Sequence, residues 1–207
     1  VASCEFSGSI VKVDVAHRTV VGTLALGGAA AKPMAMTTAM SRRMNALDKR
    51  RVYDLKHSPT GSMPQDVKTS PDGRIYYVAD MYANGVYMID AEKFTSLGFI
   101  PTGEGAHGLY PSRDAKLLYA SNRDEGTVSV ISFATHKVVQ TWTIPNGTPD
   151  MGGVSVDGKV LWLSGRYSKE VYAIDTQSGK LLARIPVGKG PHGLCVYPQP
   201  GRYSLGH

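Results

Sequence analysis

The sequence predicts an all-β fold made of repeated four-stranded units, and three observations lead to that prediction. The 207 residues are 42% hydrophobic and 19% charged, with 23 glycines and 12 prolines, a composition typical of a globular protein with many tight turns. Short segments rich in Val, Ile, Thr and Tyr recur between those turns. From Gly61 onward, nearly the same pattern returns with a period of roughly 42 residues.

The first full repeat, residues 64–103, contains four expected strands joined by turn sequences. A short first strand ends at Ser70-Pro71-Asp72-Gly73, and Asn84-Gly85 forms a later turn. We expect the other three strands of this repeat at 74–80, 86–90 and 97–101.

Two more full repeats follow the same order, with turns at Ser112-Arg113-Asp114 and Asp157-Gly158. The ends of the chain carry partial repeats. Residues 1–26 hold three strand signals without a leading strand, and residues 191–198 hold a leading strand alone. Because these two parts are complementary, we expect them to share one sheet.

Four antiparallel strands in a repeat of about 40 to 45 residues are typical of a β-propeller blade, which buries both faces against neighbouring blades. The sequence therefore predicts one β-propeller domain over residues 1–207, with about four blades in this chain. Four is the lower end of the usual range of about four to eight blades.

The strings Tyr77-Val78-Ala79-Asp80 and Tyr119-Ala120-Ser121-Asn122, each after a Ser-Pro-Asp-Gly-like turn, resemble the repeat of the YVTN-family β-propellers. The resemblance covers residues 1–26 and 61–198. It implies a bacterial, extracytoplasmic protein (periplasmic, cell-surface or secreted), a binding or scaffold role, and a ring of usually seven blades. Seven blades need about 300 residues at that repeat length. The chain is thus expected to be a small ring, a part of a larger ring, or a partial ring that self-association completes.

Aligning the repeats on their turn aspartates places four polar residues at one equivalent position, the start of the first strand: Gln65, His107, Asp150 and His192. They are 42, 43 and 42 residues apart. Because the first strands of blades converge at the mouth of the central channel, we expect these side chains to share one opening. Asp66 and Met151 take the next position and are expected to extend the same ligand-binding mouth.

Two imidazoles and a carboxylate are suitable ligands for a transition-metal ion such as Zn, Cu, Ni or Fe, so His107, Asp150 and His192 are the candidate metal ligands. The same groups could act as acid and base, or could line the channel and bond one another and water. Two functions stay open at this point. The first is a binding or scaffold protein for a small molecule or a protein partner, and the second is a metal-dependent lyase or oxidoreductase.

Other polar residues near the expected turns are weaker candidates. Arg123, Asp124 and Glu125 are interpreted as solvated charge, Arg166 and Tyr167 as residues that shape a rim, and His17 and His136 as surface residues. Cys4 and Cys195 form no metal-binding or haem-attachment motif. Their expected positions along neighbouring strands differ too much for a disulfide.

Residues 29–60 interrupt the repeats with a basic, Met-rich segment that predicts an inserted helix starting at Pro33. Its methionines and Leu47 recur at helical spacing, so it could pack on the sheets, cover one mouth, dock a partner or offer thioethers to Cu(I). The segment carries seven Lys and Arg against two Asp, which is most of the net charge of +6. The rest is nearly neutral, so no nucleic-acid partner is expected.

Several function classes are excluded by what the sequence lacks. It has no apolar run of about 18 residues for a transmembrane helix, no nucleophile elbow, no P-loop and no dinucleotide fingerprint. The chain opens on Val1 in an expected strand, which we interpret as a trimmed, processed or incomplete N-terminus.

Overall fold

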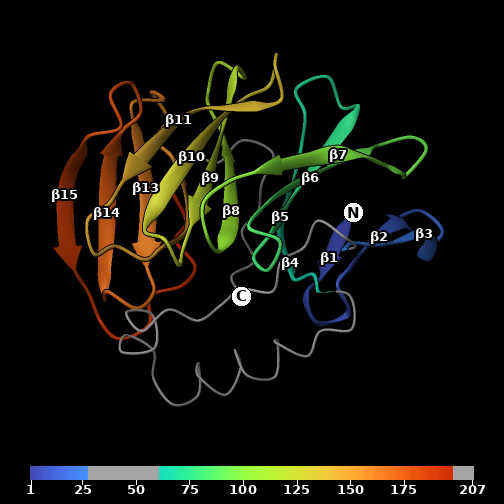
Figure 1. Ribbon diagram of the computed structural model, residues 1–207, viewed down its shortest axis with the longest axis horizontal. Coiled ribbons are helices and arrows are strands. Elements are labelled where there is room, and N and C mark those ends of the chain that lie inside the picture. Colours follow the sequence, from blue (N-terminus) through green and yellow to red (C-terminus); the bar gives the residue numbers. More distant parts are fainter. Residues whose placement is uncertain (28–60, 198–207) are drawn as a thin grey trace. The chain divides into compact units, whose positions relative to one another are not determined.

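A computed structural model describes residues 1–27 and 61–197, which form four antiparallel sheets (Figure 1). Each sheet follows the order of the chain, so every strand pairs with its neighbours in sequence. This is the all-β arrangement of four-stranded propeller blades that the repeats predict, and the prediction is confirmed. The expected helix at 29–60 lies outside the described residues.

By contacts the chain divides into two compact units, residues 1–107 and 108–207. The first unit contains one three-stranded and one four-stranded sheet. The three-stranded sheet is β1 (Ala2–Cys4), β2 (Ser9–Asp14) and β3 (Thr19–Ala25), with a 3-10 helix, η1 (Glu5–Ser7), between β1 and β2. The four-stranded sheet is β4 (Pro64–Thr69), β5 (Ile75–Asp80), β6 (Gly85–Asp90) and β7 (Ser96–Pro101). The prediction that residues 1–26 lack a leading strand is confirmed.

The second unit contains two four-stranded sheets. One is β8 (Ala106–Pro111), β9 (Leu117–Asn122), β10 (Thr127–Ser132) and β11 (Lys137–Thr143). The other is β12 (Pro149–Val154), β13 (Val160–Gly165), β14 (Glu170–Asp175) and β15 (Leu181–Pro186). The boundary between the units falls inside β8, so His107 lies on a strand that belongs to the β8–β11 sheet.

The turn between the first two strands of each full repeat is held by the same pair of side chains. A serine hydroxyl donates at 2.6 Å to the aspartate two residues later: Ser70 to Asp72, Ser112 to Asp114 and Ser155 to Asp157. Each serine oxygen also accepts the backbone N–H five residues on, at 2.9 Å. The serine hydrogen bond is the main reason that the pKa of each of these aspartates lies below its usual value.

Burial within the sheets follows the order of the strands. The third strand β10 is buried along most of its length, whereas the outer strand β11 is mostly exposed, with Trp142 as its one buried residue. In the second unit, the core between its two sheets includes Tyr119 and Trp142, whose ring centroids lie 5.2 Å apart. A separate core in the first unit joins Ile10 of β2 to Val78 and Tyr87. Apolar packing between successive sheets therefore holds each unit together.

The expected leading strand at 191–198 is wrong for the residues that the structure describes, because 191–197 form no strand. A strand needs a partner for its ladder, and none of the described strands pairs with this segment. The carbonyl of His192 accepts a hydrogen bond from the hydroxyl of Ser164 at 2.6 Å.

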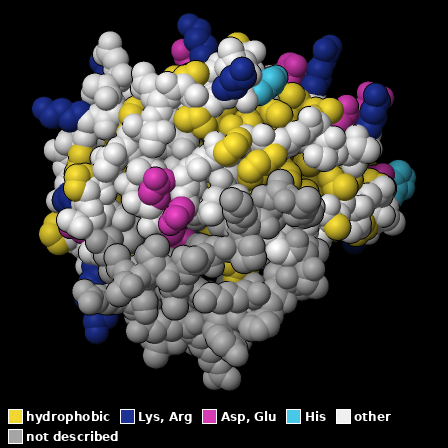
Figure 2. Space-filling view, viewed as in Figure 1, with side chains coloured by type: hydrophobic (Ala, Val, Ile, Leu, Met, Phe, Trp, Pro, Cys, Tyr) yellow, Lys and Arg dark blue, Asp and Glu magenta, His cyan; other side chains and the backbone are white. Residues whose placement is uncertain are grey.

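The remaining sequence expectations concern the surface and the cysteines. On the face drawn in Figure 2, the Lys and Arg side chains of the described residues are dispersed rather than gathered in one patch. Cys4 and Cys195 are both free thiols, as expected. Over residues 1–27 and 61–197, no helix has the length and apolar character needed to cross a membrane.

Candidate functional site

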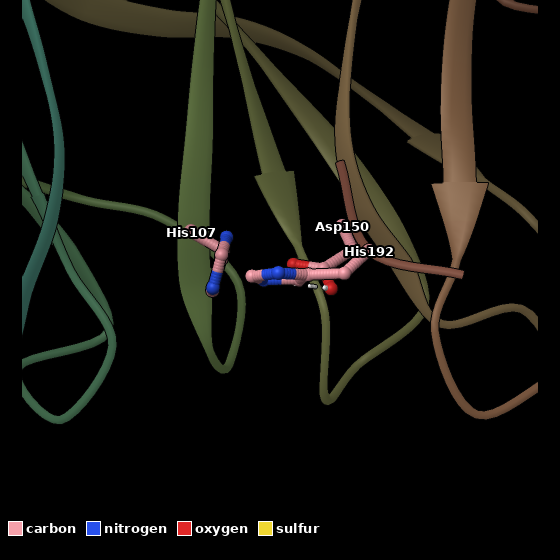
Figure 3. A group of neighbouring side chains, drawn as sticks. All are labelled: His107, Asp150 and His192. Atoms are coloured by element: carbon pink, nitrogen blue, oxygen red, sulfur yellow. Dashed lines mark ion pairs between the residues drawn. The ribbon is translucent and has the colours of Figure 1, made fainter. Parts of the chain in front are cut away.

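The three candidate metal ligands lie together in the structure. His107 comes from β8, Asp150 from β12, and His192 from the segment after β15. One donor atom from each lies within 4.8 Å of the others, and Figure 3 shows their side chains meeting. His107 is 4% exposed and Asp150 is fully buried, so the cluster is set into the protein. These three residues hold equivalent positions in successive repeats, and their side chains are neighbours in the structure.

A β-bulge places Asp150 at this point. Pro149 pairs with Gly165 and Gly152 pairs with Leu163, so Asp150 and Met151 together stand opposite the single residue Ser164. Such a bulge bends the strand locally and changes the direction of its side chains. The strand β12 can therefore keep its ladder with β13 while the Asp150 carboxylate points toward the two imidazoles.

The same bulge occurs in β4 of the first unit. Pro64 pairs with Asp80 and Val67 with Val78, which leaves Gln65 and Asp66 opposite Ala79. The bulge therefore occurs in at least two of the three full repeats.

A serine at the end of the second strand fixes the backbone of the site. Ser121 accepts the N–H of Gly108, next to His107, at 2.8 Å and donates to the carbonyl of Asp150 at 2.7 Å. Ser164, at the equivalent position, accepts the N–H of Met151 at 3.2 Å and donates to the carbonyl of His192 at 2.6 Å. Each serine thus joins the first strand of its own sheet to the site residue of the next repeat.

The first unit has the same link, since Ser3 donates at 2.5 Å to the carbonyl of Gln65. We call Ser3, Ser121 and Ser164 the staple serines. Their hydroxyls bond the backbone of the site residues, so they are positioning residues.

We expect Ser164→Ala to weaken metal binding at this cluster by about tenfold, because residues that orient metal ligands typically contribute about 10- to 100-fold in affinity. The measurement is a Zn²⁺ titration of the variant beside the unaltered protein. Ser155→Ala, which breaks a turn hydroxyl of the same sheet away from the cluster, is the matched control. Equal loss of affinity in both variants would show that Ser164 acts only through general stability.

The Asp150 carboxylate lies among three positively charged or ionisable groups. Its oxygens lie 3.7 Å from Arg123 Nη1, 4.0 Å from Arg166 Nη1 and 3.6 Å from His192 Nε2. These separations exceed hydrogen-bond length, so the attraction is between charges. In a buried place such charges interact more strongly than at the surface.

The interpretation of Arg123 and Asp124 as solvated charge is wrong. Their side chains are 7% and 3% exposed, and Arg123 Nε lies 3.9 Å from the Asp124 carboxylate. The guanidinium groups of Arg123 and Arg166 lie near the ring of Tyr167. The guanidinium carbon of Arg123 is 5.6 Å from the ring centroid, and that of Arg166 is 5.9 Å from it. Two arginines therefore meet at one aromatic ring beside Asp150.

Two other predicted site residues, Gln65 and Asp66, have partners close to them in the chain. The Gln65 amide donates to the carbonyl of Met63 at 3.2 Å, and the Asp66 carboxylate pairs with Lys68 Nζ at 2.5 Å. Met151 is buried at 7% exposure. The group of potential metal-binding side chains formed by His107, Asp150 and His192 does not include Asp66.

From the sequence, four residues that build the site are missed or given another role: Ser121 and Ser164 are given none, Arg123 is interpreted as solvated charge, and Arg166 as a rim residue. A signal for them was present, because the two serines and the two arginines are each 43 residues apart, as are His107 and Asp150. In an antiparallel sheet the second strand ends where the first begins. Residues that close the second strand therefore belong to the same end of the sheet as the residues that open the first.

Comparison with known proteins agrees with this architecture. Residues 9–201 match the family described as YNCE-like beta-propeller. Antigen Lp49 of Leptospira interrogans is 25% identical over 190 residues, which cover 80% of this chain and 41% of that protein. The chain therefore spans about two fifths of the length of this relative.

Solved structures show a similar fold. Kuenenia stuttgartiensis hydrazine synthase aligns with a TM-score of 0.55 at 22% identity, over 63% of this chain and 38% of that chain. A catalytically inactive virginiamycin B lyase from Staphylococcus aureus, solved with quinupristin, also gives 0.55, at 16% identity over 65% and 45% of the two chains. At these identities the likeness shows the β-propeller fold alone.

Proposed function

The chain belongs to the YNCE-like β-propeller family, and from that premise we propose that it is a binding protein which holds a divalent transition-metal ion at His107, Asp150 and His192. The observation that carries the proposal is the meeting of two imidazoles and one carboxylate within 4.8 Å. Imidazole and carboxylate groups together suit Zn²⁺ and the neighbouring first-row metals.

The distances support a metal ion after a small adjustment. Two ligand atoms that each lie about 2.1 Å from one ion are at most about 4.2 Å apart. The largest separation in the cluster, 4.8 Å, would therefore have to close by about 0.6 Å. Asp150 is fully buried and already lies 3.6 Å from His192, so rotation of the imidazole rings of His107 and His192 would have to supply that movement. The staple serines hold the backbone that carries Asp150 and His192.

The test is a Zn²⁺ titration of tag-free, chelator-treated protein by calorimetry, with the metal content of each sample checked by mass spectrometry. We expect one ion per chain, and we expect the double variant His107→Ala, His192→Ala to bind at least about 100-fold more weakly, since a lost ligand costs more than a lost supporting residue.

The matched control is His17→Ala. His17 Nδ1 lies 2.6 Å from the Asp14 carboxylate on an exposed turn, so it reports the binding that any surface imidazole and carboxylate would give. Unchanged affinity in the control is expected. Absence of stoichiometric binding by the unaltered protein, or equal binding by the double variant, would contradict the proposal.

The location and the partner of the protein are part of the same proposal. The similarity to Antigen Lp49 supports an extracytoplasmic protein exposed to other macromolecules, and the fold supports a protein partner that covers the site. Protease should degrade the protein in intact cells if it lies on the surface, and in cells with a permeabilised outer envelope if it is periplasmic. Protection equal to that of a cytoplasmic marker in both treatments would contradict this location. The lyase or oxidoreductase hypothesis uses the same three residues and stays a prediction.

A further inference from the structure

The two arginines beside Asp150 occupy equivalent places in successive repeats. Arg123 follows the last residue of β9, and Arg166 follows the last residue of β13. Each has a guanidinium nitrogen within 4.0 Å of the Asp150 carboxylate. They lie at the end of their sheets where β8 and β12 begin, the end that carries His107 and Asp150.

The arginines are held in place by the protein around them. The Arg123 side chain is 7% exposed and the Arg166 side chain is 17% exposed, and the ring of Tyr167 lies within 6 Å of both guanidinium carbons. The loop that carries Tyr167 is fixed in turn, because Thr148 Oγ1 accepts the N–H groups of Tyr167 and Ser168 at 3.0 and 3.1 Å. Two fixed guanidinium groups with several N–H donors each are typical of sites that recognise carboxylate or phosphate oxygens.

The net charge of the buried side chains around the two arginines decides when such an anion can bind. Asp124 and Asp150 offset the charges of Arg123 and Arg166, so the four side chains together are neutral. A divalent ion on His107, Asp150 and His192 would add two positive charges to this buried group. A buried excess of positive charge is costly unless an anion is added.

We propose that Arg123 and Arg166 form a subsite for the anionic group, carboxylate or phosphate, of a ligand that binds together with the metal ion. This inference rests on the proposed metal site. The ligand's charged oxygens lie between the guanidinium groups and the metal, which makes binding of the ion and binding of the anion mutually favourable. The class of ligand is therefore a small acid or a phosphorylated compound.

The experiment titrates acetate and phenyl phosphate, in separate arms, into Zn²⁺-loaded and chelator-treated protein by calorimetry. The same titrations of Co²⁺-loaded protein are followed by visible absorption, which changes when an anion reaches the metal. We expect the anion of the correct class to bind at least tenfold more tightly to the metal-loaded protein. Arg166→Gln should weaken that binding by about 10- to 100-fold, compared with the unaltered protein at full metal loading of each sample.

Arg184→Gln is the matched control, because Arg184 pairs with the Glu170 carboxylate at 2.7 Å and lies 5.4 Å from the ring of Tyr172. Like Arg166, Arg184 lies in the second unit beside a carboxylate and a tyrosine ring. Arg184→Gln should leave anion binding unchanged. Arg123→Gln is a second variant, expected to act as Arg166→Gln does.

The outcomes separate the two proposals. If Zn²⁺ binds and neither anion does, or if Arg166→Gln and Arg123→Gln bind the anion as well as the unaltered protein, the subsite is wrong and the metal site stands. If the anion binds equally with and without metal, the coupling is wrong. If Zn²⁺ itself does not bind, the proposed function fails, and this inference fails with it.

Discussion

Gly152→Ala should lower the free energy of unfolding by on the order of 3 kcal/mol, the upper range for overpacking a buried position. A Cβ on Gly152 would lie 1.7 Å from the carbonyl oxygen of Trp162 and 3.0 Å from the Cα of Leu163. Both atoms belong to the backbone of β13, so no side-chain rotation can relieve the clash. The strands β12 and β13 would have to separate where the Asp150 bulge is formed.

The same substitution should therefore impair the site as well as stability. The N–H of Gly152 donates to the Tyr110 hydroxyl at 2.8 Å, a contact that ties β12 to the neighbouring sheet. Urea unfolding measures the stability and a Zn²⁺ titration measures the site. Gly188→Ala is the control, because its added Cβ meets no atom within 4 Å. A loss below about 1 kcal/mol for Gly152→Ala would mean that the two strands are not packed as described.

Asp80→Ala should have a comparable effect on the first unit, with a loss of about 3 kcal/mol. Asp80 is fully buried at the end of β5, and its carboxylate accepts the N–H groups of Met63, Tyr82 and Ala83 at 2.9 to 3.1 Å, together with the Ser62 hydroxyl. Removing the acceptor leaves buried donors unsatisfied, and each such group typically costs about 1–3 kcal/mol. Asp80→Asn keeps one oxygen acceptor and should cost only about 1 kcal/mol.

The pH dependence of the Asp80→Asn variant provides a second readout. Burial is the main reason that the pKa of Asp80 is raised, against the opposing effect of its hydrogen bonds. A raised pKa in the folded state means that the carboxyl contributes its stability fully below its unfolded pKa and loses it as the pH rises through the folded value. The cost of Asp80→Asn should thus be larger near pH 4 than near pH 7. A cost that grows from pH 4 to pH 7 would contradict the raised pKa.

The sequence predicts the repeat and its turns because their signals are local. The serine and aspartate of each turn are two residues apart, and their hydrogen bond forms in all three full repeats. Equal spacing is also enough to predict that His107, Asp150 and His192 occupy equivalent places, and the structure brings one donor atom of each within 4.8 Å of the others.

Features that depend on pairing between strands could not be predicted in the same way. The bulge at Asp150 is defined by which residues of β13 it faces, and nothing within β12 alone reveals that register. Arg123 looks like a solvated turn residue because its burial comes from Asp150 and Tyr167, which lie in the next repeat. The leading strand expected at 191–198 is absent from residues 191–197, because none of the described strands pairs with them.

X-ray absorption at the zinc edge tests most directly whether equivalent residues of successive repeats share one metal ion. For the Zn²⁺-loaded protein we predict two imidazole nitrogens and a carboxylate oxygen at about 2.0–2.2 Å, with the imidazole scattering lost in the His107→Ala, His192→Ala variant. A zinc environment without imidazole, or one that the double variant leaves unchanged, would contradict the account.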